Sequence, residues 1–228
     1  MREAVASQNR AVIAYPKQAA FGRVLPKNKI YEHSGANARL KELFVAQVEQ
    51  IVWQYKLAPE TINLPAKQGV PELQIFSIQL KMAELNLDVL RCIDGAVQFP
   101  IIFELIFDGR TQVIAAYKRQ NESDASRWVL SDYFASAWFP SDIERAAMPL
   151  VLDLGGLYEQ VLHRLIPKPA RPQENLADFV SRVELISSMQ REVEVAASKL
   201  AKEKQFNRKV ELNAQLRKLK SELEVLQR

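Results

Sequence analysis

The stretch FPIIFELIFDGRTQVIAAYK, residues 99–118, decides the fold of this 228-residue chain. Two short runs rich in apolar and β-branched residues, 99–107 and 110–118, lie on either side of Asp108-Gly109. An Asp-Gly pair between two such runs is typical of a two-residue β-hairpin turn, because both central residues of that turn need positive φ. The stretch therefore predicts two adjacent antiparallel strands and, with them, a sheet.

The segments around this hairpin predict further strands and helices. ELQIFSIQLK (72–81) is short, apolar and β-rich and predicts a strand, as does RWVLSDYFASAWF (127–139). Apolar residues at helical spacing in LNLDVLRCIDGAV (85–97) and LGGLYEQVLHRLI (154–166) predict two helices. A further helix is expected before the first strand, with Ser34 or Asn37 as its cap.

The helix that begins near Asn37 carries one apolar stripe that continues to about Tyr55. Trp53 and Lys56 would then lie at its C-terminus, where they can anchor the helix to the sheet or stack on nucleic-acid bases. With this helix, the element order is α-β-α-β-β-β. We therefore expect an α+β fold with a mainly antiparallel sheet flanked by helices.

The chain is expected to have four parts. Residues 1–23 show no sustained period, and the first 30 residues hold six cations against Glu3 alone, so a basic irregular arm is predicted over residues 1–23, followed by the α+β domain over residues 24–166. PKPARP, residues 167–172, has three prolines in six residues and predicts a stiff linker. Residues 173–228 form the last part, and they contain no glycine and no proline.

The last part has the pattern of a long coiled-coil helix. Apolar residues three and four apart run from Leu176 to Leu200, and a second such seam runs from Leu212 to Leu226. A continuous helix over residues 173–228 would be about 80 Å long at 1.5 Å per residue. Because a small domain cannot cover a seam of that length, we expect this helix to pair with a partner helix.

The two seams are out of register, and the break falls in KEKQFNRKVELN, residues 202–213. The charge changes sign at about the same place. Residues 173–198 carry two cations and five anions, which is net −3, whereas residues 199–220 carry eight cations and two anions, which is net +6. Such a distribution favours antiparallel pairing with a second copy or with another chain.

The break also contains the best candidate for a binding surface. Phe206 and Val210, four residues apart, form a short apolar patch surrounded by cations and offset from both seams. Cations spaced along a helix can follow a phosphate backbone or complement an acidic protein surface. The candidate partner- or nucleic-acid-binding residues are Lys202, Lys204, Phe206, Arg208, Lys209, Val210, Arg217, Lys218 and Lys220.

A catalytic site is less well supported. Some metal-dependent nucleases combine an acidic residue with a D/E/Q-x-K motif on a sheet, where carboxylates hold a divalent ion and the lysine supports the attacking water. Gln79-Leu80-Lys81 matches that motif at the end of a predicted strand, with Glu49 and Glu72 as the carboxylates. This divergent nuclease site, Glu49, Glu72 and Lys81, is kept as an alternative to a lysine at an exposed strand end.

Other kinds of site are not indicated. There is no nucleotide-binding glycine motif, no histidine or cysteine at metal-ligand spacing, and therefore no expected metal or cofactor. The single cysteine, Cys92, is expected in the core and fits a reducing compartment. No apolar run approaches the about 20 residues that cross a bilayer, and no signal peptide is evident, so a cytoplasmic protein with no membrane contact is expected.

Five stretches of the chain resemble a known family. They are LPKNKIY, KELFVAQVEQIVWQYKLAPETINLP, ELQIFSIQLK, YEQVLHRL and EKQFNRKVELNAQLRKLKSELEVL, and they occur in this order from about Val24 to the C-terminus. Together they resemble the bacterial family called domain of unknown function 4391. The resemblance brings no catalytic residues. It implies genes near helicases and DNA methyltransferases, in restriction or phage-defence clusters.

We therefore expect a non-enzymatic accessory or scaffold protein of a bacterial nucleic-acid-processing system, such as restriction-modification or phage defence. Its C-terminal helix would self-associate or recruit a partner protein, and the resemblance implies a helicase or a DNA methyltransferase as that partner. DNA is the second candidate partner. Two alternatives stay open: the divergent metal-dependent nuclease, and a homodimeric structural protein without nucleic-acid contact.

Overall fold

The computed structural model describes residues 11–121, 123–124 and 127–227. The chain divides into two compact units between Pro169 and Ala170, inside the proline-rich stretch PKPARP. The basic arm predicted for residues 1–23 is described only from Ala11 onward, so that part of the prediction over residues 1–10 lies outside the described residues.

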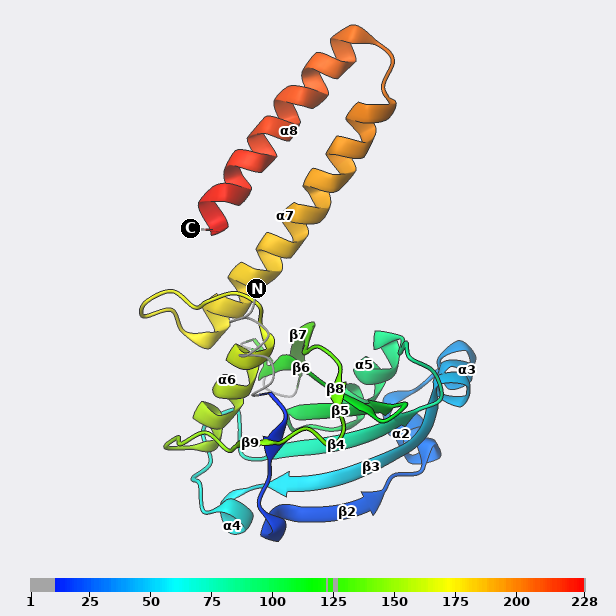
Figure 1. Cartoon of the computed structure of the whole chain (residues 1–228), viewed down its shortest axis with the longest axis vertical. Helices are drawn as coiled ribbons and strands as arrows, with labels where there is room; N and C mark the ends of the chain where they lie inside the picture. The colour runs from blue at the N-terminus through cyan, green and yellow to red at the C-terminus, as the bar shows by residue number, and fades with distance from the viewer. Residues whose placement is uncertain (1–10, 122, 125–126, 228) are drawn as a thin grey trace. The chain divides into compact units, whose positions relative to one another are not determined.

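The first unit is built on one large sheet with the strand order β2-β3-β4-β5-β6-β7, and β8 also pairs with β6 (Figure 1). Among these described strands only β4 and β5 are parallel. Helix α5 joins this pair, because parallel strands need a crossover connection. The strands are β2 (Ala20–Val24), β3 (Val48–Leu57), β4 (Leu73–Leu80), β5 (Ile101–Phe107), β6 (Arg110–Gln120), β7 (Trp128–Ala135) and β8 (Phe139–Pro140).

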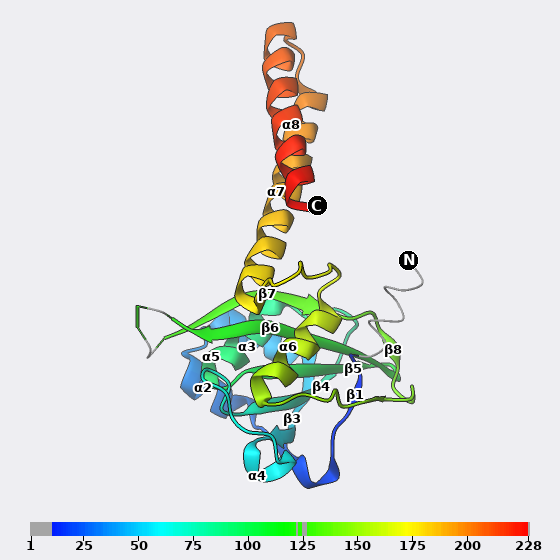
Figure 2. The same ribbon diagram turned by 90° about the vertical axis from the view of Figure 1, so that its left-hand side faces the viewer.

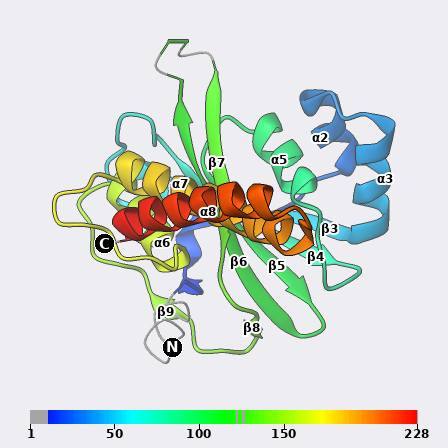
Figure 3. The ribbon, with the colours of Figure 1, turned by 90° about the horizontal axis from the view of Figure 1, so that it is seen from above.

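Helices cover both faces of this sheet. Figures 2 and 3 show α2, α3 and α5 on one face and α6 on the opposite face. The helices are α2 (Lys27–Ser34), α3 (Ala38–Gln47), the short α4 (Pro59–Ile62), α5 (Leu87–Ala96) and α6 (Leu154–Leu165), with a 3-10 turn η1 at Lys17–Ala19. The predicted α+β fold with a mainly antiparallel sheet flanked by helices is confirmed.

The main apolar core lies between the sheet and α2, α3 and α5. Phe44 of α3 and Ile93 of α5 pack there with Phe76 and Phe103 of neighbouring strands, and all four are at most 1% exposed. Burying a side chain of this size contributes about 1.5–3 kcal/mol relative to leaving it in water. Cys92 is buried in the same core, as expected from the sequence.

The hairpin predicted from Asp108-Gly109 is confirmed. Asp108 has φ 47° and Gly109 has φ 67°, so both turn residues occupy the left-handed region. The strands on either side, β5 and β6, pair antiparallel up to Phe107 and Arg110. The turn chemistry therefore sets the register of β5 and β6, as the local sequence indicates.

The prediction of a helix from about Asn37 to Tyr55 is wrong for the second half of that segment. Asn37 caps α3 by accepting a hydrogen bond from the Leu40 amide at 2.9 Å, but α3 ends at Gln47 and the chain continues as β3. Residues that would lie on one helical stripe, such as Val48 and Ile51, are buried by the strand as well. Trp53, Tyr55 and Lys56 accordingly lie on β3 and not at a helix C-terminus.

The opposite face of the sheet is partly covered by an N-terminal strap, defined here as residues 11–19. In the strap, β1 (Ile13–Ala14) pairs in parallel with β9 (Ala146–Ala147) as a separate two-stranded sheet. Arg145, next to β9, donates both to the Ile13 carbonyl oxygen and to Glu104 of β5. Glu104 follows the core residue Phe103 in β5, and successive side chains of a strand point to opposite faces of the sheet. The Glu104 side chain therefore points to the face opposite the main core. The strap therefore lies on that face.

The second unit is a helical hairpin. Helix α7 (Leu176–Lys202) begins at the cap residue Asn175, and helix α8 (Phe206–Gln227) returns antiparallel beside it (Figures 1 and 2). The long C-terminal helix predicted from the sequence is thus present in two parts, interrupted at residues 203–205. The chain reverses inside the stretch KEKQFNRKVELN, where the two seams lose their common register.

Candidate functional site

The two seams of the hairpin face each other. The five leucines of the α8 seam are half-buried or buried, and so are the α7 seam residues Val193, Ala197 and Leu200. The leucines are Leu212, Leu216, Leu219, Leu223 and Leu226. The partner helix expected for the α7 seam is therefore supplied by the same chain, and the change of register marks the reversal between the two helices.

Glu203 stabilises the turn between α7 and α8. Its carboxylate accepts hydrogen bonds from the backbone amides of Lys204 at 2.8 Å and Gln205 at 2.9 Å, and its Oε2 lies 3.6 Å from Nε of Arg208. These amides hold the pKa of Glu203 below its ordinary value. Backbone amides before a helix have no intrahelical acceptor, so a carboxylate at this position lets the chain reverse without glycine or proline.

The turn presents an apolar patch in a cationic setting. We define the tip as residues 202–210. Phe206 is 78% exposed and Val210 is 55% exposed, and they lie one helical turn apart on α8. The tip also carries the exposed cations Lys202, Lys204, Arg208 and Lys209, against Glu203 alone, which is net +3. The structure thus brings six of the nine predicted binding residues together.

The other three predicted binding residues are not part of the tip. Arg217, Lys218 and Lys220 are exposed on the second half of α8, and the Lys218 ammonium lies 3.9 Å from Glu222. Arg217 is about 10 Å further along the helix axis than Val210, at 1.5 Å per residue. The candidate docking surface is therefore smaller than predicted and is centred on Phe206.

Two of the predicted nuclease residues do meet. The Lys81 ammonium lies 3.9 Å from the Glu49 carboxylate and donates to the Val45 carbonyl oxygen at 2.9 Å. Lys27 donates to the carbonyl oxygens of Val48 at 2.5 Å and of Phe44, so two lysines satisfy the carbonyl groups at the C-terminus of α3. Cations are favourable there because the helix dipole is negative at that end.

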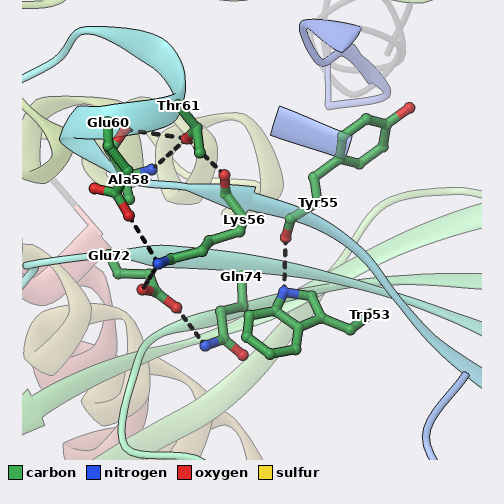
Figure 4. A network of polar contacts seen from close by, with 8 residues as sticks. All are labelled: Trp53, Tyr55, Lys56, Ala58, Glu60, Thr61, Glu72 and Gln74. Atoms are coloured by element: carbon green, nitrogen blue, oxygen red, sulfur yellow. Dashed lines mark hydrogen bonds and ion pairs between the residues drawn. The ribbon is translucent and has the colours of Figure 1, made fainter. Parts of the chain in front are cut away.

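The third predicted nuclease residue lies elsewhere. Glu72 precedes β4, whereas Lys81 follows it, which separates them by about 30 Å along an extended strand. Figure 4 shows Glu72 in a different network, 3.4 Å from Lys56 and hydrogen-bonded to Gln74 at 2.5 Å, with Lys56 also bonded to Glu60 at 2.8 Å. Glu49, Glu72 and Lys81 therefore do not form one site.

In the part of the chain that the structure describes, no three histidine, cysteine, aspartate or glutamate side chains are grouped so that they could hold a metal ion. A surface pocket of about 370 Å³ adjoins Glu49, and it is lined also by Lys27, Gln50 and Gln79. Its polar lining residues are one carboxylate, two amides and a lysine, so it lacks the pair of carboxylates that the nuclease alternative requires.

Sequence reasoning missed a buried ion pair in the first unit. Lys118 of β6 and Asp94 of α5 are 2% and 3% exposed, with Nζ and Oδ1 3.6 Å apart. Lys118 donates to the carbonyl oxygens of Asp94, at 2.6 Å, and of Val97, so it caps the C-terminus of α5. Tyr133 donates to Asp94, and burial raises the pKa of Asp94 to about 6.

The sequence signal for this pair is a charged residue at a core position. Asp94 lies within the apolar helix LNLDVLRCIDGAV, and Lys118 ends the apolar run VIAAYK. Charged side chains are almost never fully buried without a partner, so two such positions indicate a pair. The pair caps the C-terminus of α5 and thereby supports the fold.

No helix in the described ranges combines the length and the apolar character needed to cross a membrane.

Comparison with known protein families identifies a match. The sequence profile of the family described as "Domain of unknown function (DUF4391)" matches residues 13–223. No curated protein and no solved structure matches the chain. The profile spans both units and most of the chain, so the protein belongs to the DUF4391 family.

Proposed function

We propose that this chain is a non-enzymatic accessory or scaffold protein that recruits a partner protein through the tip of its C-terminal hairpin. The observation that carries the proposal is the exposure of Phe206, 78%, on the first turn of α8. A phenylalanine moved from water into an apolar pocket contributes about 1.5–3 kcal/mol. Aromatic anchors of this kind, rather than total buried area, supply most of the affinity of a protein interface.

The side chains of the tip predict the kind of partner surface that would bind them. An apolar pocket would receive Phe206 and Val210, and acidic groups around it would face Lys202, Lys204, Arg208 and Lys209. A net charge of +3 on so short a segment favours encounter with an acidic surface. We also propose a bacterial nucleic-acid-processing system, restriction or phage defence, as the setting and a helicase or DNA methyltransferase as the kind of partner, which is what the resemblance noted in the sequence implies.

A paired substitution tests the role of the tip. The double variant Phe206→Ser/Val210→Ser is expected to capture at least tenfold less of the partner from the native host, which corresponds to about 1.4 kcal/mol of binding free energy. The matched control is Leu185→Ser/Val225→Ser, which removes two exposed apolar side chains of the same hairpin outside the tip. Quantitative mass spectrometry of the captured proteins, followed by titration with the purified partner, measures the difference.

Duplex DNA is the competing partner, and the same assay separates it. If the tip binds DNA, replacing Lys202, Lys204, Arg208 and Lys209 with glutamine should weaken binding to a DNA duplex and flatten its salt dependence. The serine variant should then bind as well as the wild type, because phosphates need charge and not an apolar anchor. Equal capture of the partner by the tip variant and its control would overturn the proposal.

A further inference from the structure

The hairpin has an open groove along one side. Between α7 and α8 lies a hollow of about 400 Å³, lined from α7 by Glu192, Val195 and Lys199 and from α8 by Leu212 and Leu219. Val195 is 52% exposed, and the two leucines are only half-buried. Two helices packed side by side cannot cover both sides of their common seam, so this groove leaves apolar surface in water.

We propose that a second copy of this chain occupies the groove, with the two hairpins packed antiparallel about a two-fold axis to form four helices. The first argument is the distribution of charge along the hairpin. Residues 199–211, around the turn, carry five cations and two anions, which is net +3. Residues 173–186 and 222–227, at the other end, carry one cation and five anions, which is net −4. Antiparallel packing points each basic end toward the acidic end of the other copy.

Those two stretches do lie at the same end of the hairpin. Arg171 donates to the carbonyl oxygen of Leu226 at 2.9 Å, which brings the beginning of the second unit next to the end of α8. The acidic end is therefore a property of the folded hairpin and not only of the sequence. A parallel arrangement of two copies would instead place like charges together, which is unfavourable.

The second argument comes from the groove itself. Glu192 and Lys199 are seven residues apart, so they share one face of α7, with Val195 and Ala196 between them. A two-fold axis through the middle of this segment brings Glu192 of each copy opposite Lys199 of the other and lets the Val195 side chains meet. An isologous interface needs such a self-complementary patch, in which residue i contacts j and j contacts i.

The proposed dimer does not rest on the function proposed for the tip. The groove and the tip share no residue, and Phe206 and Val210 do not line the groove. Each copy would therefore keep Phe206 and Val210 available to a partner, since the charge argument involves the cations of the tip and not these two side chains. A failure of the partner-capture experiment would leave the dimer untouched, and a monomeric chain would leave the tip proposal untouched.

Charge exchange tests the dimer. In light scattering of the full chain, the wild type is expected to have the mass of two copies. Glu192→Lys and Lys199→Glu should each raise the dissociation constant at least tenfold, because each places like charges opposite one another twice. The double variant Glu192→Lys/Lys199→Glu should return to the mass of the wild type, since the pairs form again with their signs exchanged.

The matched control is Glu194→Lys, which makes the same change of charge two residues away, on an exposed position that does not line the groove. It is expected to stay dimeric, and circular dichroism confirms that all variants keep their helices. A wild type with the mass of one copy would overturn the inference. So would a double variant that stays dissociated, or a control that dissociates as readily as Glu192→Lys.

Discussion

Replacing Lys118 with methionine is expected to lower the free energy of unfolding of the first unit by about 3–5 kcal/mol, the range for breaking a buried ion pair on one side. Asp94 would then keep a carboxylate in the core with Tyr133 as its remaining side-chain donor. The carbonyl groups of Asp94 and Val97 at the end of α5 would also lose their cap. An effect of this size is a large share of the stability of an ordinary domain.

The double variant Lys118→Met/Asp94→Asn provides the control. Asparagine removes the charge but can still accept from Tyr133, so at least half of the lost stability should return. All three tryptophans, Trp53, Trp128 and Trp138, lie in the first unit, and their fluorescence during urea unfolding of the full chain reports on that unit alone. A Lys118→Met chain as stable as the wild type would show that the pair does not support the fold.

The pH dependence of stability gives a second test of the same pair. The folded-state pKa of Asp94, about 6, lies above the unfolded value of about 3.9, so the folded state holds this proton more tightly. The contribution of Asp94 to the free energy of unfolding is therefore largest below a pH of about 4 and declines as the pH rises through about 6. Asp94→Asn should remove that decline. Burial lowers the pKa of Lys118, which acts in the opposite direction at higher pH.

Arg145→Met is expected to lower the free energy of unfolding by about 3 kcal/mol and to release the N-terminal strap. Arg145 binds the buried Glu104 carboxylate through two hydrogen bonds, of 2.8 and 2.9 Å, and also donates to the Ile13 carbonyl oxygen. The variant leaves a carboxylate buried without its partner and removes one contact that holds the strap on the sheet. Hydrogen exchange of residues 11–15 should accelerate more than exchange in β4 or β5.

Arg145→Lys is the conservative control for this variant. A lysine keeps the positive charge but cannot make the two parallel hydrogen bonds, so a smaller loss is expected. Glu104→Gln in the Arg145→Met background should restore part of the stability, because it removes the unpaired charge. Unchanged exchange of the strap in Arg145→Met would mean that β1 and β9 hold it without this contact.

The sequence predicts those parts of the fold in which the local signal and the final structure agree. Asp108-Gly109 indicates a hairpin turn from the local sequence alone. Asn37 caps a helix whether that helix ends at Gln47 or continues to Tyr55. The segment after α3 could not be predicted, because Val48 and Ile51 are three residues apart, as on a helical stripe, and both face the core in β3 only through the irregular register between Val48 and Gln50. Its pairing with β2 and β4, which are distant in sequence, selects the strand.

The local sequence likewise predicts only part of the candidate site. The break in register and the change of charge coincide with the reversal of the chain at residues 203–205, and Phe206 and Val210 are exposed just after it. The reversal of the chain there was missed because turns usually contain glycine or proline, and here the Glu203 carboxylate replaces them. The grouping of Glu49, Glu72 and Lys81 failed because sequence proximity to one strand does not say at which end of it a side chain lies.

The tip exists only if α7 and α8 fold back on each other, and a distance measured between Gln190 and Ser221 tests this most directly. Spin labels at these two exposed positions, in chains diluted with unlabelled protein, report the distance within one chain. The hairpin predicts about 15–25 Å, since packed helices lie about 8–10 Å apart and the label linkers add to that. A distribution centred near 45 Å, roughly the separation along one continuous helix, would contradict the hairpin and with it the proposed docking site.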